Sequence, residues 1–218
     1  MASKSPPSKT WDGIVSRYLN RRLSRPIASF LAARTTVSPN TITLLSFIVA
    51  LSGALGFLLG MPWLGGVLAQ TSSILDGVDG DLAKRLQKVS RLGAYLDSVL
   101  DRYADAALVA SMTFYASRST GPFIALIVGL SALTGSLLVS YTRALSSSIG
   151  EPGFSSSFSN YAGNRDVRLL VVMVGSITGF VMETLVFLAV LTNLVVIARI
   201  VETKRRSESS PVDLARVP

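Results

Sequence analysis

The 218-residue sequence contains neither cysteine nor histidine. Without cysteine there is no disulfide, no thiolate nucleophile and no cysteine-bound metal. Without histidine, Ser-His hydrolysis, imidazole acid–base catalysis and histidine-bound zinc are excluded. Any chemistry must therefore use carboxylates, basic groups, hydroxyls and a hard metal ion.

Charged residues are also scarce. They make up 16% of the chain, against about 25% in an average soluble domain. Hydrophobic residues make up 49%, and the mean hydropathy is +0.49. This composition predicts a protein that buries most of its surface in lipid, and the length fits one domain.

The formal net charge is +8, but the basic residues stand between long apolar runs. This placement is typical of residues that orient membrane spans, so it favours a lipid bilayer over nucleic acid as a partner. The first 38 residues lack a compact apolar segment followed by a small-residue cleavage site, so no signal peptide is expected.

Residues 11–34 are predicted to form amphipathic juxtamembrane helices, after a disordered leader at residues 1–10. A basic helix of this kind suits an anionic membrane surface, and the alternative is a helix that packs on its own protein. Pro26 predicts a break between two helices. The apolar face of the first helix would consist of Trp11, Ile14, Val15, Tyr18, Leu19 and Leu23.

Six apolar stretches follow, and the first opens with Ser38 as a cap and Pro39 at the first helical position. It is long enough to cross a hydrocarbon core of ~30 Å. The expected fold is an all-α membrane protein: six transmembrane helices preceded by an amphipathic interfacial helix. The catalytic domain would cover residues 35–206, and a disordered cytoplasmic tail residues 207–218. The spans are residues 38–60, 62–80, 93–115, 122–145, 167–180 and 182–201.

Lysine and arginine are distributed unevenly about these spans. Seven precede residue 39, and others follow the second, fourth and sixth spans. The connections after the first and fifth spans have none, and the one after the third has only Arg118. This asymmetry predicts an integral protein of the cell membrane with both termini in the cytoplasm. The ends of spans two and three that meet at Lys88 would then be cytoplasmic as well.

Six of the 13 acidic residues lie between Asp76 and Asp105. Asp76 and Asp79 are three residues apart at the end of span two, and Asp97 and Asp101 are four apart near the start of span three. Each pair therefore shares one helix face, and the four carboxylates converge if the helices are neighbours. Like charges so close repel unless a cation lies between them, and all-oxygen ligation suits Mg²⁺ or Mn²⁺.

One alternative to a metal site is that these carboxylates lie at solvated helix ends or form ion pairs with Lys84, Arg85 and Arg102. A second alternative is a cation transporter whose carboxylates line an ion path. A path should place polar groups along its whole length, whereas these carboxylates crowd at one face.

The spacing resembles the motif of the CDP-alcohol phosphotransferases: D-x-x-D-G-x-x-A-R, eight residues, then G-x-x-x-D-x-x-x-D. The matching residues are Asp76, Asp79, Gly80, Ala83, Gly93, Asp97 and Asp101, and Lys84 stands where the family has arginine. Lysine keeps the positive charge but loses the bidentate fork of arginine.

The resemblance implies a reaction in which an acceptor hydroxyl attacks the β-phosphate of a CDP-alcohol and CMP leaves. It also implies a homodimer and two metal ions, Mg²⁺ or Mn²⁺, held by Asp76, Asp79, Asp97 and Asp101. Asp101 would be the general base as well. The CDP-binding residues would be Asn40, Thr43, Asp76, Gly80, Ala83 and Lys84.

The acceptor is expected to meet Asp105 and three arginines, Arg143, Arg165 and Arg168. Clustered guanidinium groups suit an acceptor phosphate, and the alternative is that they only determine topology. Asp105 lies one turn beyond Asp101 and is suited either to a polyol acceptor or to an ion pair with Arg102.

Two substrate classes remain open. The strings "DGIVSRYLNRRLS", "YLDSVLDRYAD" and "GNRDVRLL" are similar to synthases that join CDP-inositol to inositol phosphate, and this is the leading expectation. In the alternative, a phospholipid synthase moves a phosphatidyl or archaetidyl group from a CDP-lipid to inositol phosphate, glycerol phosphate or another polar alcohol.

Overall fold

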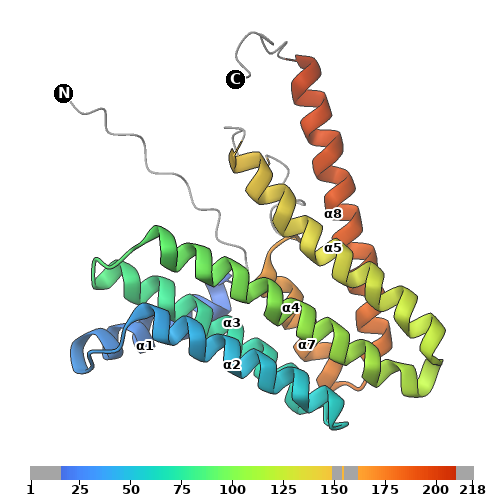
Figure 1. The fold of residues 1–218 in the computed structure, drawn as a ribbon, viewed down its shortest axis with the longest axis horizontal. Helices are drawn as coiled ribbons and strands as arrows, with labels where there is room; N and C mark the ends of the chain where they lie inside the picture. The colour runs from blue at the N-terminus through green and yellow to red at the C-terminus, as the bar shows by residue number, and fades with distance from the viewer. Residues whose placement is uncertain (1–15, 149–153, 155–161, 210–218) are drawn as a thin grey trace.

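The computed structural model describes residues 16–148, 154 and 162–209 (Figure 1). Within these residues the chain forms seven α-helices and no strand, which confirms the all-α prediction. After a turn of π-helix at Ser16–Asn20, the helices are α1 (Arg21–Arg34), α2 (Pro39–Leu58), α3 (Pro62–Arg85), α4 (Arg91–Thr120), α5 (Pro122–Ser148), α7 (Arg165–Ile177) and α8 (Val181–Ser209).

Both ends of the chain lie partly outside the described residues. The segments outside are the predicted leader at residues 1–10, the first residues of the juxtamembrane segment, and residues 210–218 of the predicted tail. Residues 207–209, which were expected in the tail, continue helix α8.

Three helices are long and apolar enough to cross a membrane: α2, α5 and residues 181–206 of α8. Helices α3 and α4 have the length, but both carry carboxylates, and α7 has only 13 residues. By length and composition, the described residues therefore support three of the six predicted spans.

Helix α1 runs without a break from Arg21 to Arg34, with Pro26 inside it. The predicted break is therefore wrong. Ser24 and Ala28 are buried on the side of α1 that packs against α3, and this packing outweighs the hydrogen bond that proline cannot make. Tyr18 and Phe30 are exposed, so the segment still presents apolar side chains outward.

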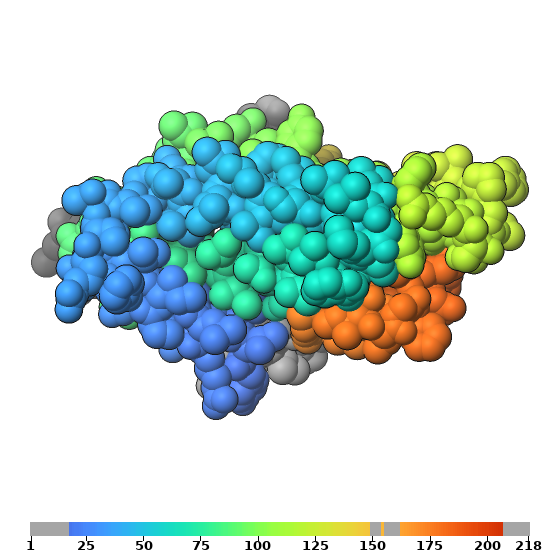
Figure 2. All heavy atoms as spheres, turned by 90° about the horizontal axis from the view of Figure 1, so that it is seen from below, coloured from blue at the N-terminus to red at the C-terminus, as the bar shows by residue number. Residues whose placement is uncertain are grey.

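Helix α2 packs against α3 and α4, α3 also packs against α1 and α7, and α5 packs against α4 and α8 (Figure 1). The turns after α2, α4 and α7 gather at one end of the molecule (Figure 2). Each turn contains a glycine with positive φ: Gly60 (81°), Gly121 (85°) and Gly179 (83°). Glycine adopts this conformation without steric cost, so the chain reverses within a few residues. The opposite end holds the acidic residues of α3 and α4.

Helices α2 and α3 approach closely through small residues. A Cβ atom on Gly53 would lie 3.0 Å from the carbonyl oxygen of Gly65, and one on Gly65 would lie 2.6 Å from the Phe57 ring. Gly53 and Gly65 therefore allow the close packing of α2 against α3. This packing fixes the position of α3, and so of its acidic end, along α2.

Candidate active site

Three carboxylates from neighbouring helices converge at one end of the bundle. Asp76 lies on α3, while Asp97 and Asp101 lie on α4, and one oxygen from each lies within 4.8 Å of the others. The four-residue step between Asp97 and Asp101 keeps both on one face of α4. The structure thus brings together three of the four aspartates that the sequence grouped.

The start of α4 is set by a side-chain cap. Ser90 Oγ accepts a hydrogen bond of 3.0 Å from the Gly93 backbone N–H, and Ser90 itself has an extended backbone. A serine in this position satisfies one of the free N–H groups at a helix start. Because α4 begins here, the face with Asp97 and Asp101 turns toward α3.

Asp79 is not one of the three converging carboxylates. It is buried, and its Oδ2 accepts a hydrogen bond from the Thr43 hydroxyl of α2. The structure therefore connects an expected metal ligand with an expected nucleotide-binding residue. Asp76, Asp97 and Asp101 offer the all-oxygen donor set that Mg²⁺ and Mn²⁺ prefer, so they fit a divalent cation.

Arg165, the first residue of α7, reaches into this cluster. Its Nη1 lies 2.8 Å from Asp101 Oδ1 and 3.4 Å from Asp76 Oδ1, and its Nε lies 3.1 Å from Asp105 Oδ1. Burial lowers the pKa of the guanidinium, but the three carboxylates raise this pKa by more, and the net shift is upward. Arg165 therefore stays charged and ties α7 to both α3 and α4.

Asp105 is buried among three arginines. Its carboxylate lies 3.3 Å from Arg102 Nη1 and 3.3 Å from Arg168 Nη2, in addition to its contact with Arg165. The ion pair with Arg102, one of the two expectations for Asp105, is present. A buried carboxylate with these partners holds the three arginine side chains in place.

A cavity of about 180 Å³, the nucleotide-side cavity, lies among α2, α3 and the start of α4. It contains five of the six residues expected to bind CDP, all but Asp76, together with Asp97 from the acidic cluster. Gly80 is exposed, and a Cβ atom there would meet nothing within 4 Å, which leaves open space beside α3. The expected residues that line it are Asn40, Thr43, Gly80, Ala83 and Lys84.

A larger cavity of about 650 Å³, the arginine cavity, lies between α4, α5 and the start of α7. Asp101 lines it, as do the three arginines expected to meet the acceptor: Arg143, Arg165 and Arg168. Asp105 does not line it. Arg143 Nη2 donates a hydrogen bond of 2.9 Å to Asn164 Oδ1, which holds one guanidinium at the entrance of α7.

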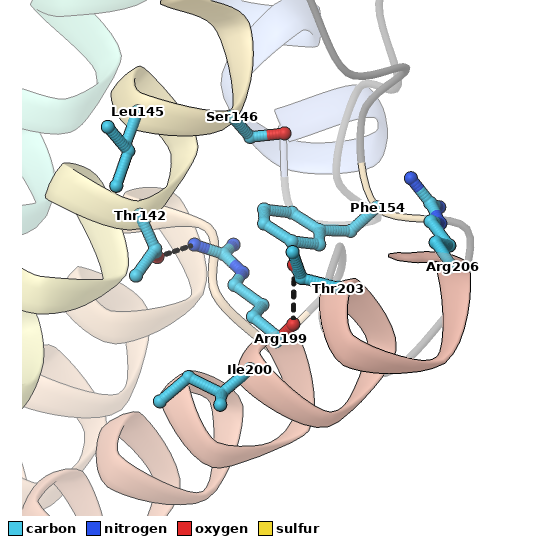
Figure 3. Close-up of a pocket in the computed structure, with 8 residues that line it drawn as sticks. All are labelled: Thr142, Leu145, Ser146, Phe154, Arg199, Ile200, Thr203 and Arg206. Atoms are coloured by element: carbon cyan, nitrogen blue, oxygen red, sulfur yellow. Dashed lines mark hydrogen bonds between the residues drawn. The ribbon is translucent and has the colours of Figure 1, made fainter. Parts of the chain in front are cut away.

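Arg199 was not identified from the sequence as a candidate functional residue. It is buried in α8, donates hydrogen bonds to the Val139 carbonyl and to Thr142 Oγ1 (2.9 Å), and lies 4.7 Å from the centre of the Phe154 ring. Arg199, Thr142 and Phe154 border a cavity of about 220 Å³ between α5 and α8 (Figure 3). The available signal was an arginine within an otherwise apolar predicted span, where charge is costly.

Comparison with known proteins places these features in a family. The sequence model of the CDP-alcohol phosphatidyltransferase family matches residues 36–209. The bifunctional IPC transferase and DIPP synthase of Aquifex aeolicus is 36% identical over 194 residues, which cover 87% of this chain and 44% of that protein. The chain thus spans less than half the length of this relative.

Two further comparisons cover most of both chains. The archaetidylinositol phosphate synthase of Pyrococcus horikoshii is 28% identical over 172 residues, 79% of this chain and 86% of that protein. A crystal structure of the phosphatidylinositol phosphate synthase of Mycobacterium tuberculosis, in complex with manganese and citrate, has a TM-score of 0.70. It is 23% identical and covers 89% of this chain and 93% of that chain, which establishes the fold.

Proposed function

Since this chain belongs to the CDP-alcohol phosphatidyltransferase family, we propose that it is a membrane-embedded, metal-dependent CDP-alcohol phosphotransferase. An acceptor hydroxyl attacks the β-phosphate of a CDP-alcohol, a phosphodiester forms, and CMP leaves. The observation that carries the proposal is the meeting of Asp76, Asp97 and Asp101 within 4.8 Å, between two cavities.

The acidic residues are proposed to hold two ions, Mg²⁺ or Mn²⁺, through Asp76, Asp79, Asp97 and Asp101. The manganese in the structure of the Mycobacterium tuberculosis relative supports a divalent cation. When bound, the ions would neutralise negative charge on the pyrophosphate. Thr43 orients Asp79 through its hydroxyl, so α2 contributes to the same site.

Asp101 is proposed as the general base. It lines the arginine cavity, where the acceptor would lie, and it also belongs to the carboxylate cluster beside the phosphate. A carboxylate at this junction can take the proton from the attacking hydroxyl. Arg165 fixes its orientation through the contact of 2.8 Å.

The nucleotide is proposed to bind in the nucleotide-side cavity. Asn40 and Thr43 supply polar groups from α2, and Lys84 supplies positive charge near the phosphates. Gly80 and Ala83 leave space along α3, as the absence of atoms around a Cβ at Gly80 indicates. Asp76 would contribute from the carboxylate cluster.

The acceptor is proposed to bind in the arginine cavity, with its phosphate against Arg143, Arg165 and Arg168. Asp105 contributes by holding Arg165 and Arg168 in place, because its carboxylate contacts both. Its direct contact with an acceptor would require one of these ion pairs to open.

The leading substrates are CDP-inositol and inositol phosphate, as the name DIPP synthase of the Aquifex aeolicus relative favours. The alternative is a phospholipid synthase with a CDP-lipid donor, which the name of the Pyrococcus horikoshii relative favours. Both use the same carboxylates and differ in the alcohol that the donor carries.

The membrane arrangement is proposed as six spans with the acidic end, both termini and the active site in the cytoplasm. Helices α3 and α4 would cross with their carboxylates at the cytoplasmic end, beside the three apolar helices. The exposed apolar residues of α1 support a location at the membrane surface. A homodimer is proposed from the family resemblance alone.

An assay of CMP release tests the proposal. Purified protein is incubated with Mg²⁺, inositol phosphate and either CDP-inositol or CDP-diacylglycerol. CMP that appears only when donor, acceptor and Mg²⁺ are all present supports the reaction. No CMP with any CDP-alcohol would refute it.

A further inference from the structure

A fourth cavity, of about 150 Å³, lies between the start of α1, the acidic half of α3 and the start of α7. We call it the α1 cavity. It reaches Asp76, while the nucleotide-side cavity reaches Asp97 and the arginine cavity reaches Asp101. Each of the three converging carboxylates therefore lines a different cavity.

Three groups must be placed around the reacting phosphorus: the nucleotide, the acceptor and the donor's own alcohol. The proposed function places the nucleotide in the nucleotide-side cavity and the acceptor in the arginine cavity, and the inference below rests on that function. We infer that the α1 cavity binds the alcohol carried on the β-phosphate, and that this alcohol is a hydroxyl-rich polyol rather than a lipid.

The lining of the α1 cavity determines this preference. Apart from two glycines, every residue that lines it has a polar or charged side chain. Acyl chains would displace water from this polar lining without replacing the hydrogen bonds of that water, which is costly. A polyol offers donors and acceptors around its whole ring. The polar residues are Asn20, Arg21, Ser73, Asp76, Asp81, Lys84 and Asp166.

The wall of the cavity is held by a chain of hydrogen bonds that links three elements. Gln70 Nε2 donates to Asn20 Oδ1 (2.9 Å), Asn20 Nδ2 donates to Ser73 Oγ (2.9 Å), and Ser73 Oγ donates to Asp166 Oδ1 (3.0 Å). The exposed fractions of Gln70, Asn20 and Ser73 are 4%, 2% and 1%. Polar groups so deeply buried and mutually bonded are fixed before a ligand arrives.

Asn20 and Asp166 can bind a ligand while they keep their hydrogen bonds to Ser73. The Asn20 amide carries two N–H groups, and the Asp166 carboxylate has two oxygens, so each can hold its neighbour and a substrate hydroxyl together. Ser73 lies one helical turn before Asp76, and Asp166 follows Arg165. The same side chains thus position the donor alcohol relative to the reacting groups.

Steady-state kinetics with the full chain in detergent tests the inference. The KM for CDP-inositol and the KM for inositol phosphate are measured in the wild type, Asp166→Asn and Ser73→Ala. Ser52→Ala is the matched control, because its hydroxyl is exposed on α2 and donates only to the Ile48 carbonyl.

We expect CDP-inositol to release CMP at least about tenfold faster than CDP-diacylglycerol at equal concentration. In both cavity variants, the KM for CDP-inositol should rise about tenfold, as the loss of about 1.4 kcal/mol of binding would produce, while the KM for inositol phosphate stays within twofold. The Ser52→Ala control should match the wild type. Thermal unfolding of each variant shows that the chain is folded.

The failures are distinguishable. CMP release from CDP-diacylglycerol alone, or an unchanged KM for CDP-inositol in both variants, overturns the donor-alcohol assignment and leaves the reaction class intact. An equal rise in both KM values also overturns it, since the cavity would then act on the whole site. No CMP from either donor refutes the proposed function, and the assignment with it.

Discussion

Nη1 of Arg165 lies 2.8 Å from Oδ1 of Asp101, so the first residue of α7 forms an ion pair with the proposed base on α4. The same atom lies 3.4 Å from Asp76 on α3. One buried guanidinium thus connects the two helices that carry the carboxylate cluster. The relative positions of base, metal ligands and acceptor cavity therefore depend on how α7 packs.

Asp101→Asn should abolish turnover while the chain stays folded. The amide keeps the size of the side chain but cannot accept the acceptor's proton, and general base catalysis contributes about 10²- to 10⁴-fold. CMP release should fall by that factor. Glu183→Gln, an exposed acidic residue at the start of α8, is the control and should retain wild-type activity. An Asp101→Asn variant with ordinary kcat would remove the residue from this role.

Asp105→Asn should destabilise the protein as well as impair it. Removal of one partner of a buried ion pair costs about 3–5 kcal/mol, because the remaining charges lose their compensation. Here Arg165 and Arg168 lose a common carboxylate. The thermal unfolding midpoint should fall clearly, whereas Asp81→Asn, which alters a partly exposed contact with Ser24, should change it little.

A double variant, compared by thermal unfolding with its two single variants, tests whether Asp105 and Arg168 stabilise each other. In Asp105→Leu/Arg168→Met, the buried charge and one partner are removed together, so the loss of stability should be smaller than the sum of the single losses. Strict additivity of the two effects would mean that Asp105 and Arg168 do not stabilise each other.

Helical periodicity predicted the acidic cluster because its geometry is local. Asp97 and Asp101 share a face of α4 whatever surrounds them, and a short connection brings that face to Asp76. The predicted cap at Ser38 is equally local, since the serine hydroxyl accepts a hydrogen bond from an N–H three residues ahead. Such features can be read from spacing alone.

The partners of the arginines could not be predicted in the same way. Arg165 meets Asp76 and Asp101 only because α7 packs against α3, and no spacing within one helix encodes that contact. Pro26 illustrates the same limit, since the burial of Ala28 against its neighbours keeps α1 continuous where local chemistry favours a break.

Lys84→Met should weaken binding of the nucleotide. Lys84 borders the nucleotide-side cavity, and its ammonium group is the proposed positive charge beside the phosphates. The KM for the CDP-alcohol should rise about tenfold, with a smaller change in kcat, because one charge-assisted hydrogen bond is worth about 1.5–3 kcal/mol. Lys84→Arg keeps the charge and should stay near wild type.

The neighbouring Arg85 provides a matched control. It is exposed and does not line the nucleotide-side cavity, so Arg85→Met removes the same charge from the same helix end without touching the proposed site. If both methionine variants raise the KM equally, the effect comes from the general surface potential and Lys84 has no specific contact.

Addition of Mg²⁺ or Mn²⁺ should stabilise the protein even without substrate. Asp76, Asp97 and Asp101 repel one another at this separation, and a cation that binds only the folded chain adds about 2.7 kcal/mol at 100 times its Kd. The thermal midpoint should rise with metal and fall again with EDTA. Asp97→Asn should remove the metal-dependent rise, whereas Asp81→Asn, outside the group of three, should preserve it. A rise that persists in Asp97→Asn would place the stabilising cation elsewhere in the chain.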